Sequence, residues 1–403
     1  NQQHLYCFSS HNDSSCIVRL LSKYAGGIIM RRKAIKVLLI AIAIIILGGA
    51  ITLYLIGKPA KVNTDKKLNG VSDELCSVLY YASLAANSHN IQSWTVKLDV
   101  REQRIMISID AERTLEIVDP EYREIYISLG CYIEALAFAF DVYGYNTMVE
   151  YADFSDAHNE IVTVSYCRRE NAEINSRQLE TIKRRHTDKR SYNTDRINPE
   201  VIIQLLKDID GIYCYEMGTT EFDYLKNGTM EAITKQSTEA EYRKELNQWM
   251  RFSNTEVEQK KDGISAEMIG LNGIIKAFYY LTTNHKNAEN DTFATQGIET
   301  AEKQTENCSA FFVITGNDTI IDWIEAGRKT QAFWYRCVEN NISIQPLSAM
   351  LEVAPYSEAI QSELGVTEER VQMILRAGYV NDYGENVGVR RNLKDYITVI
   401  NSD

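Results

Sequence analysis

The sequence predicts an α+β fold that follows a single membrane-spanning helix, and three features indicate this. An uncharged apolar run covers residues 37–57, apolar residues alternate with period two in several short segments, and two long helical patterns carry small residues at matching positions. Apolar residues make up 45% of the 403, which is enough for a sizeable core. Because helical patterns surround the strand patterns, we expect a mixed or antiparallel sheet.

The apolar run at residues 37–57 has the length of a transmembrane helix, about 20 residues. Arg31, Arg32, Lys33 and Lys36 precede it, so the positive-inside rule predicts a cytoplasmic segment over residues 1–36 and an extracytoplasmic C-terminal part. Lysines that follow the run oppose this orientation. A cleaved signal peptide has a shorter apolar region of about 7–15 residues, which favours an uncleaved single-pass anchor.

The arginine pair before the span also resembles a twin-arginine export signal, a route that carries proteins already folded around a cofactor. The alternative is that Arg31 and Arg32 only supply positive charge before the membrane. Met30 stands directly before them and is a second candidate for the start of translation. After the span, the polar, lysine-rich residues 58–68 are typical of a linker.

The remaining chain divides into two halves, residues 69–175 and 176–403, that repeat one helical pattern. The helices are expected at Tyr126–Gly144 and Trp323–Asn341. Aligning Gly130 with Gly327 places Gly144 opposite Asn341, and Gly and Asn are the residues that most easily end a helix in the left-handed conformation. The alternative is a chance match between two helices.

Six segments show the alternation expected of strands, at residues 94–98, 104–109, 161–166, 212–217, 310–315 and 372–379. Between about residues 216 and 307 the sequence is polar and helical, without a strand partner. We interpret this stretch as either a lid over a site or an ordinary helical insertion.

Charge and cysteine content exclude some classes of function. The formal net charge of −12 gives no support for nucleic-acid binding. The eight cysteines are scattered without a CxxC pair, so no metal site is assigned, and Cys131 and Cys337 are expected in the core. Against the acidic background, a cluster of cations at residues 183–189 stands out as either an anion site or a solvated helix end.

Two segments far apart in sequence supply complementary chemistry. Residues 87–94 (NSHNIQSW) offer neutral amide and hydroxyl groups, and residues 184–190 (RRHTDKR) offer cations with a hydroxyl. Flavin mononucleotide (FMN) needs both, because its ring is recognised by neutral donors and acceptors and its phosphate by Arg or Lys. The sequence therefore predicts that these segments meet around one FMN.

These segments, with Ala326–Gly327, Trp249–Arg251 and the C-terminal Arg390–Arg391, resemble the nitroreductase superfamily in its fused double-domain, Acg-like branch. The resemblance extends from Tyr80 to Tyr396. It implies a nitroreductase-like fold in which two tandem halves form a pseudo-dimer with one composite FMN site per chain. Ser93 departs from the family pattern, which usually has proline there.

The resemblance also implies roles for individual residues. The phosphate would be held by Arg185, Thr187, Lys189, Arg391 and Arg390, the last of which could instead pair with an acidic neighbour. The ring would be approached by Asn87, Ser88 and Asn90, with backbone near its N5 edge from Leu347, Ser348 and Ala349. Gln92 and Trp94 would brace the loop, and no catalytic side chain is named.

The function implied is NAD(P)H-dependent two-electron reduction of nitroaromatic or quinone-like compounds. No GxGxxG stretch follows a strand, so no separate nicotinamide domain is expected. The alternatives are an FMN-sequestering protein whose lid blocks turnover and a degenerate fold that serves only as an interaction module. The sequence leaves open whether two chains form a homodimer.

Overall fold

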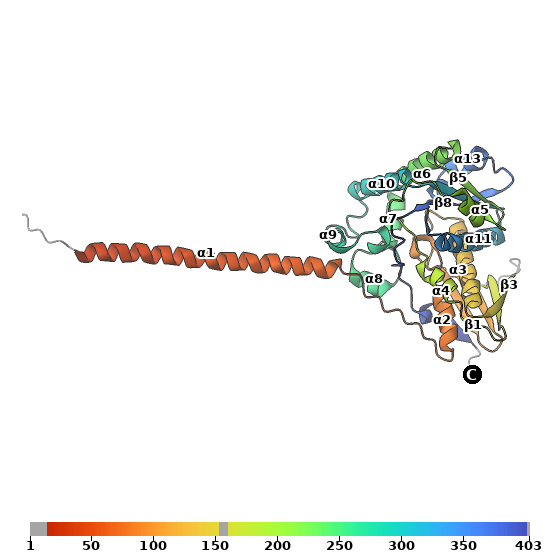
Figure 1. The fold of residues 1–403 in the computed structure, drawn as a ribbon, viewed down its shortest axis with the longest axis horizontal. Helices are drawn as coiled ribbons and strands as arrows, with labels where there is room; N and C mark the ends of the chain where they lie inside the picture. Colours follow the sequence, from red (N-terminus) through yellow and green to blue (C-terminus); the bar gives the residue numbers. More distant parts are fainter. Residues whose placement is uncertain (1–13, 153–159, 401–403) are drawn as a thin grey trace, which may run out of the picture. The chain divides into compact units, whose positions relative to one another are not determined.

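The computed structural model describes residues 14–152 and 160–400. It separates into two units, residues 1–57 and residues 58–403. The described part of the first unit is one helix, α1 (Ser14–Gly57). The second contains two sheets with helices around them, so the chain is a mixed α+β protein (Figure 1).

Helix α1 contains the expected apolar run and begins well before it. Residues Leu21–Gly57 pass the length and composition test for a membrane span, and no residue of their apolar 18-residue window is buried. One further described helix, α3 (Arg123–Val142), passes the same test, but it is largely buried inside the second unit, as a core helix is. A signal sequence meets the same criteria as an anchor, so the choice between them stays a prediction.

The first sheet has the strand order β3-β4-β2-β1-β9. Its strands are β1 (Trp94–Asp99), β2 (Arg104–Ile109), β3 (Tyr145–Tyr151), β4 (Val162–Arg168) and β9 (Ile397–Ile400). Neighbours are antiparallel except β9, which runs parallel to β1 with Val96 opposite Ile397. The C-terminal strand therefore completes a sheet whose other strands all come from the first 168 residues.

The second sheet is antiparallel, in the order β5-β6-β8-β7. Its strands are β5 (Ile212–Glu216), β6 (Ala310–Gly316), β7 (Ile342–Pro346) and β8 (Arg370–Tyr379). All six strands expected from the alternation are present across the two sheets, with ends shifted by a few residues. Strands β3, β7 and β9 were not expected from the sequence.

The helices complete the second unit. In addition to α3 they are α2 (Asp73–Ala82), α4 (Ser176–Arg184), α5 (Pro199–Leu206), α6 (Thr220–Thr238), α7 (Ala240–Trp249), α8 (Asn254–Lys260), α9 (Gly273–Thr282), α10 (Asp291–Glu306), α11 (Ile320–Glu339), α12 (Ala349–Glu352) and α13 (Tyr356–Glu363). Helices α6 to α10 occupy the polar stretch between β5 and β6, as expected for an insertion without a strand of its own.

Helices α3 and α11 pack against each other through reciprocal glycine contacts. A Cβ atom on Gly130 would lie under 3.0 Å from the carbonyl oxygen of Ile324, and one on Gly327 equally close to that of Ile127. The aligned pair Phe138 and Tyr335 stacks between the helices with ring centroids 4.4 Å apart. The residues aligned from the sequence repeat thus meet each other in the structure.

The expected helix ends are also present. Gly144 has φ +82° and Asn341 has φ +55°, so each takes the left-handed conformation just after its helix. Cys131 and Cys337 are buried, as expected. The packing crosses the expected boundary between residues 175 and 176, because Ile182 of α4 and Ile397 of β9 both belong to the core around the first sheet.

Candidate functional site

The amide-bearing segment forms a loop in an unusual backbone conformation. His89, Asn90 and Gln92 have φ of 49°, 55° and 54°, a region that non-glycine residues rarely adopt. Asn87 braces the loop from inside, since its Oδ1 accepts from the backbone N–H of Gln92 at 2.9 Å. Three such residues within four positions indicate a loop held in place by its surroundings, as is common at binding sites.

The cation-bearing segment follows α4 and is fixed to the second sheet. Arg376 on β8 is fully buried, and its guanidinium donates to the carbonyl oxygens of Asp188 (3.2 Å) and Arg190 (2.6 Å). The Asp188 carboxylate accepts from Ser343 on β7 at 3.0 Å and pairs with Arg190 at 2.7 Å. These contacts pair Arg190 within the protein, whereas Arg185 and Lys189 form no ion pair among the described residues.

The two segments meet at the turn formed by residues 83–85. Arg185 Nε donates to the carbonyl oxygen of Leu84 at 3.1 Å. Arg390, from the C-terminal segment, donates to the carbonyl oxygens of Ser83 and of Ala85, and its Nη1 donates to Asn90 Oδ1 at 3.0 Å. The structure therefore brings together Asn90, Arg185 and Arg390, which are spread over 300 residues of sequence.

Arg185 and Arg390 lie in a region of uncompensated positive charge. Both are buried, and neither forms an ion pair within the described ranges. Burial, and then the neighbouring Arg185, lower the pKa of Arg390 to about 9. Burial also lowers the pKa of Arg185. Two buried guanidinium groups without a carboxylate are costly unless an anion neutralises them.

Further buried donors surround Arg185. Its Nη1 has no hydrogen-bond partner among the described residues, nor do the indole N–H of Trp334 and the hydroxyl of Tyr383. The Arg185 guanidinium lies over the Trp334 ring at 4.7 Å from its centroid. Buried polar atoms are almost always paired, so this group of donors fits a polar ligand with acceptor oxygens, as a phosphate has.

Thr187 and Lys189 are partly buried. The pKa of Lys189 is lowered by burial and by the charge of Arg376, and Lys189 in turn helps burial to lower the pKa of His89 to about 4. Lys189 therefore lies near the loop of residues 87–92, on the side of His89. The Thr187 hydroxyl forms no hydrogen bond to a described residue, so the structure assigns it no structural role.

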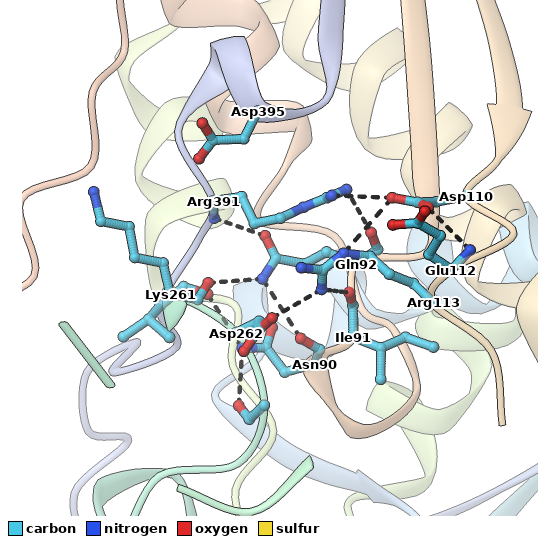
Figure 2. Close-up of polar contacts among 12 residues, drawn as sticks. Asn90, Ile91, Gln92, Asp110, Glu112, Arg113, Lys261, Asp262, Arg391 and Asp395 are labelled. Carbon is cyan, nitrogen blue, oxygen red and sulfur yellow. Dashed lines mark hydrogen bonds and ion pairs between the residues drawn. The ribbon is translucent and has the colours of Figure 1, made fainter. Parts of the chain in front are cut away.

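Arg391 has a different environment from Arg390. Its Nη1 pairs with Asp110 at 3.1 Å, and its Nη2 donates to the carbonyl oxygens of Gln92 (2.7 Å) and Trp94 (2.8 Å) (Figure 2). Its backbone N–H donates to Gln92 Oε1 at 2.9 Å. These contacts neutralise Arg391 within the protein, so Arg390 is the better candidate for an anion ligand.

The insertion between β5 and β6 closes over the same loop. The side-chain amide of Asn90 donates to the Gly263 carbonyl oxygen at 3.0 Å, and the Gly263 N–H donates to the Asn90 carbonyl oxygen at 3.1 Å. Gln92 Nε2 donates to the Lys261 carbonyl oxygen at 2.9 Å (Figure 2). Asp262 accepts from Arg113 at 2.9 Å and from Arg251 at 2.6 Å. The residues expected to face or brace a ring are therefore held from the other side by the insertion.

An acidic pair lies beside Ser88. The Ser88 hydroxyl donates to Glu124 Oε2 at 2.8 Å, and the Glu124 carboxyl is hydrogen-bonded to that of Glu352 at the end of α12. Gln236 of α6 donates to Glu352 Oε2 at 2.6 Å. Burial, and then the charge of Glu124, hold the pKa of Glu352 well above its usual range.

Leu347, Ser348 and Ala349 are buried between β7 and α12. The N–H of Leu347 donates to Ile374 on β8 at 2.8 Å, and the Ser348 hydroxyl contacts the sulfur of Met373 at 3.0 Å. Because α12 begins at Ala349 and carries Glu352, this segment is connected to the Ser88 loop through the acidic pair.

Sequence reasoning missed several residues around the site. Glu124 and Glu352 carry no local motif, and only the fold brings them together. Asp262 stands in an Asp-Gly pair, which is a turn signal, and Gly263 has φ +70° as such a turn requires. Gln331 is a polar residue on the buried face of α11, and its side chain accepts from the N–H of Ala86 at 3.0 Å.

Comparison with known proteins gives distant structural likenesses. No family model and no curated protein matches the chain. An FMN-dependent nitroreductase from Mycobacterium smegmatis in complex with NADPH is similar at 14% identity and a TM-score of 0.35, over 54% of this chain and 95% of that chain. A nitroreductase-like family protein from Bacillus cereus is similar at 13% identity and a TM-score of 0.29, over 55% of this chain and 95% of that chain. A nitroreductase with bound FMN from Bacteroides fragilis is similar at 12% identity and a TM-score of 0.28, over 50% of this chain and 87% of that chain.

Proposed function

We propose that this chain is an FMN-binding oxidoreductase of the nitroreductase superfamily, of the fused double-domain kind, with one composite site per chain. The observation that carries the proposal is the meeting of Arg185 and Arg390, buried without an ion-pair partner among the described residues, at the turn that leads into the loop of residues 87–92. Guanidinium groups bind phosphate through directed, charge-assisted hydrogen bonds. The unpartnered Nη1 of Arg185 supplies such a donor.

The residues present fit FMN in its two chemical parts. Arg185 and Arg390, with Lys189 and Thr187 nearby in sequence, would hold the phosphate. The loop from Asn87 to Asn90 and the segment of residues 346–349 supply neutral groups for the ring. Arg391, with its carboxylate partner, would position the loop rather than touch the phosphate.

The proposed pseudo-dimer is supported by the packing of α3 on α11. The reciprocal approach of Gly130 and Gly327 is what a two-fold relation between the halves requires. Each half contributes differently to the site, because residues 83–92 come from the first and Arg185 and Arg390 from the second. This asymmetry supports a single flavin per chain rather than two.

When bound, a flavin supplies two-electron chemistry, accepting hydride from NAD(P)H and passing the electrons to a nitroaromatic or quinone-like compound. The chain's own residues would orient the ring and exclude water. Burial and the charge of Glu124, whose carboxylate accepts from Ser88, disfavour the ionised form of Glu352. We propose that this acidic pair holds a proton near the expected ring position.

We further propose that α1 is an uncleaved anchor, with the second unit outside the cytoplasm. The length and apolar character of Leu21–Gly57 and the cations that precede residue 37 support this. Protease added to intact cells should then cleave the part after Gly57. Full protection would reverse the proposed orientation.

The test of FMN binding compares FMN with riboflavin, which lacks the phosphate. Titration of the detergent-solubilised full chain should give one FMN per chain. In Arg185→Met, the dissociation constant for FMN should rise by about 10- to 100-fold, since hydrogen bonds to charged groups contribute roughly 1.5–3 kcal/mol. Riboflavin binding should be unchanged, because it makes no phosphate contact.

Arg184→Met is the matched control. Arg184 is the adjacent cation, but its guanidinium donates to Asn341 at 2.7 Å and lies over the ring of Tyr383. Its loss should leave the dissociation constant for FMN within about twofold, a factor that corresponds to well under 1 kcal/mol. Equal weakening in both variants, or equal loss of FMN and riboflavin, would contradict the assignment. Anaerobic oxidation of NADPH with a nitroaromatic acceptor then separates turnover from retention alone.

A further inference from the structure

Helix α9 (Gly273–Thr282) exposes large apolar side chains to solvent along one face. Ile274, Ile275, Phe278 and Leu281 are 60, 62, 52 and 55% exposed. Their spacing of one, three and three residues places them on one side of a helix. Lys276, on the opposite side, is buried, and so is Ala277 at the edge of the exposed face. A helix with its apolar face outward is typical of a surface that meets a membrane or another protein.

The buried side of α9 holds the residues that directly follow α1. Lys276 Nζ forms a buried ion pair with Glu267 and donates to the carbonyl oxygen of Lys58 at 2.8 Å. Glu267 accepts from the N–H of Ala60 at 3.2 Å, and Asn254 donates to the Lys58 carbonyl at 3.2 Å. Residues 58–60 are thus fixed to the base of α9 by several polar contacts within the second unit.

Covalent continuity then places α9 at the membrane. Lys58 is bonded to Gly57, the last residue of the apolar helix that we propose as the span. A chain leaves the bilayer where its apolar span ends, so residue 58 lies at the membrane surface and α9 is held beside it. The nearby Lys58 and Lys61 are exposed and suit the anionic headgroups of such a surface.

We infer that α9 is an interfacial helix whose face of Ile274, Ile275, Phe278 and Leu281 enters the headgroup region of the same bilayer that α1 crosses. The helix therefore gives the second unit a second attachment and a fixed orientation on the lipid surface. Its occupant is lipid rather than a second copy of the chain, because the buried side of the same helix holds residues 58–60, which directly follow the apolar span. The inference rests on α1 being a span and is independent of FMN.

The test measures contact with lipid at single labelled positions in the full chain. The chain is reconstituted in phosphatidylcholine–phosphatidylglycerol nanodiscs, with the native cysteines outside the core replaced by serine. An environment-sensitive fluorophore is attached to Phe278→Cys, and its quenching by doxyl-labelled lipid is recorded. Ile203→Cys on α5 is the control, since Ile203 is 69% exposed and also a large apolar residue. Ile45→Cys on α1, where Ile45 is 72% exposed, reports the span itself.

Doxyl lipid should reduce the fluorescence at positions 278 and 45 by at least about twofold and leave position 203 unchanged, because an interfacial helix lies at the depth of the acyl-chain boundary. Equal lack of quenching at 278 and 203 would overturn the inference. If the fluorescence of the label at position 278 depends on the protein-to-lipid ratio and is not quenched by doxyl lipid, the occupant of the face is a second copy of the chain instead. Lack of quenching at position 45 would remove the span and the inference with it, whatever the outcome of flavin binding.

Discussion

Replacing Gly327 with alanine should destabilise the second unit, although alanine is the better helix former. The Cβ of Gly327→Ala would lie under 3.0 Å from the Ile127 carbonyl oxygen, which belongs to the backbone of α3 and cannot rotate away. The carbon–oxygen contact must therefore open by about 1 Å or more to reach a normal van der Waals distance. Only separation of the two helices can supply this movement.

The magnitude follows from two opposing effects. Alanine in a helix interior is favoured over glycine by about 1 kcal/mol. Overpacking of a rigid core contact costs about 1–3 kcal/mol, and here the cost lies at the upper end because backbone meets backbone and the neighbouring stack of Phe138 on Tyr335 must shift as well. We expect a net loss of about 2 kcal/mol, which lowers the unfolding temperature of a unit of this size by roughly 3 °C.

The assay is thermal unfolding of the detergent-solubilised full chain, followed by intrinsic fluorescence. Gly297→Ala on α10 is the control, because nothing lies within 4 Å of the position a Cβ would take. That substitution should raise the unfolding temperature slightly, by the helix propensity alone. The double variant Gly130→Ala/Gly327→Ala should lose less than the sum of the single variants, since one separation of α3 from α11 relieves both clashes. A Gly327→Ala protein as stable as the parent would refute the reasoning.

Three further outcomes are expected. Burial is the main cause that lowers the pKa of His89 from 6.5 to about 4. Between these pH values the unfolded state binds more protons, so the free energy of unfolding falls by up to about 3 kcal/mol as the pH drops from 6.5 to 4. Urea unfolding between pH 7 and 4 should show a steeper loss for the parent than for His89→Gln, and parallel curves would contradict the burial of His89. Lys276→Met removes one partner of a buried ion pair and should lower the free energy of unfolding by about 3–5 kcal/mol. Adding Glu267→Gln should restore part of this stability in thermal unfolding, and no rescue would mean that the two residues are not coupled. Asp262→Asn weakens the contacts from Arg251 and Arg113 that hold the insertion on the loop of residues 87–92. The rate of FMN release, measured by stopped flow, should therefore rise several-fold. An unchanged rate would show that the insertion does not retain the flavin.

The elements with strong local patterns were predicted from the sequence. Helices α3 and α11 were expected with their glycines and left-handed ends, because an apolar period and a C′ residue are both local signals. The six strands with period-two alternation were expected for the same reason. Strand β9 was not, because its four residues pair with β1 across about 300 positions, and parallel pairing leaves no turn signal.

At the candidate site, too, local patterns were readable from the sequence and long-range contacts were not. The sequence could indicate that the amide-bearing and cation-bearing segments meet, since their chemistry is complementary. It could not distinguish Arg390 from Arg391, because that difference depends on Asp110, which the fold brings to one guanidinium and not to the other. Asn90 was expected to face a ring, but in the structure its amide also holds Gly263, a contact set by the insertion's path.

The position of β9 has a consequence for biogenesis. Strand β1 is synthesised about 300 residues before the strand that pairs with its free edge, and Arg390 emerges from the ribosome only shortly before β9. The first sheet must therefore wait with one edge unpaired while the rest of the polypeptide is made, a long-range closure of the kind that slows folding. Assembly of the proposed FMN site and closure of the sheet become one late event, so a nascent chain halted before residue 390 would hold neither.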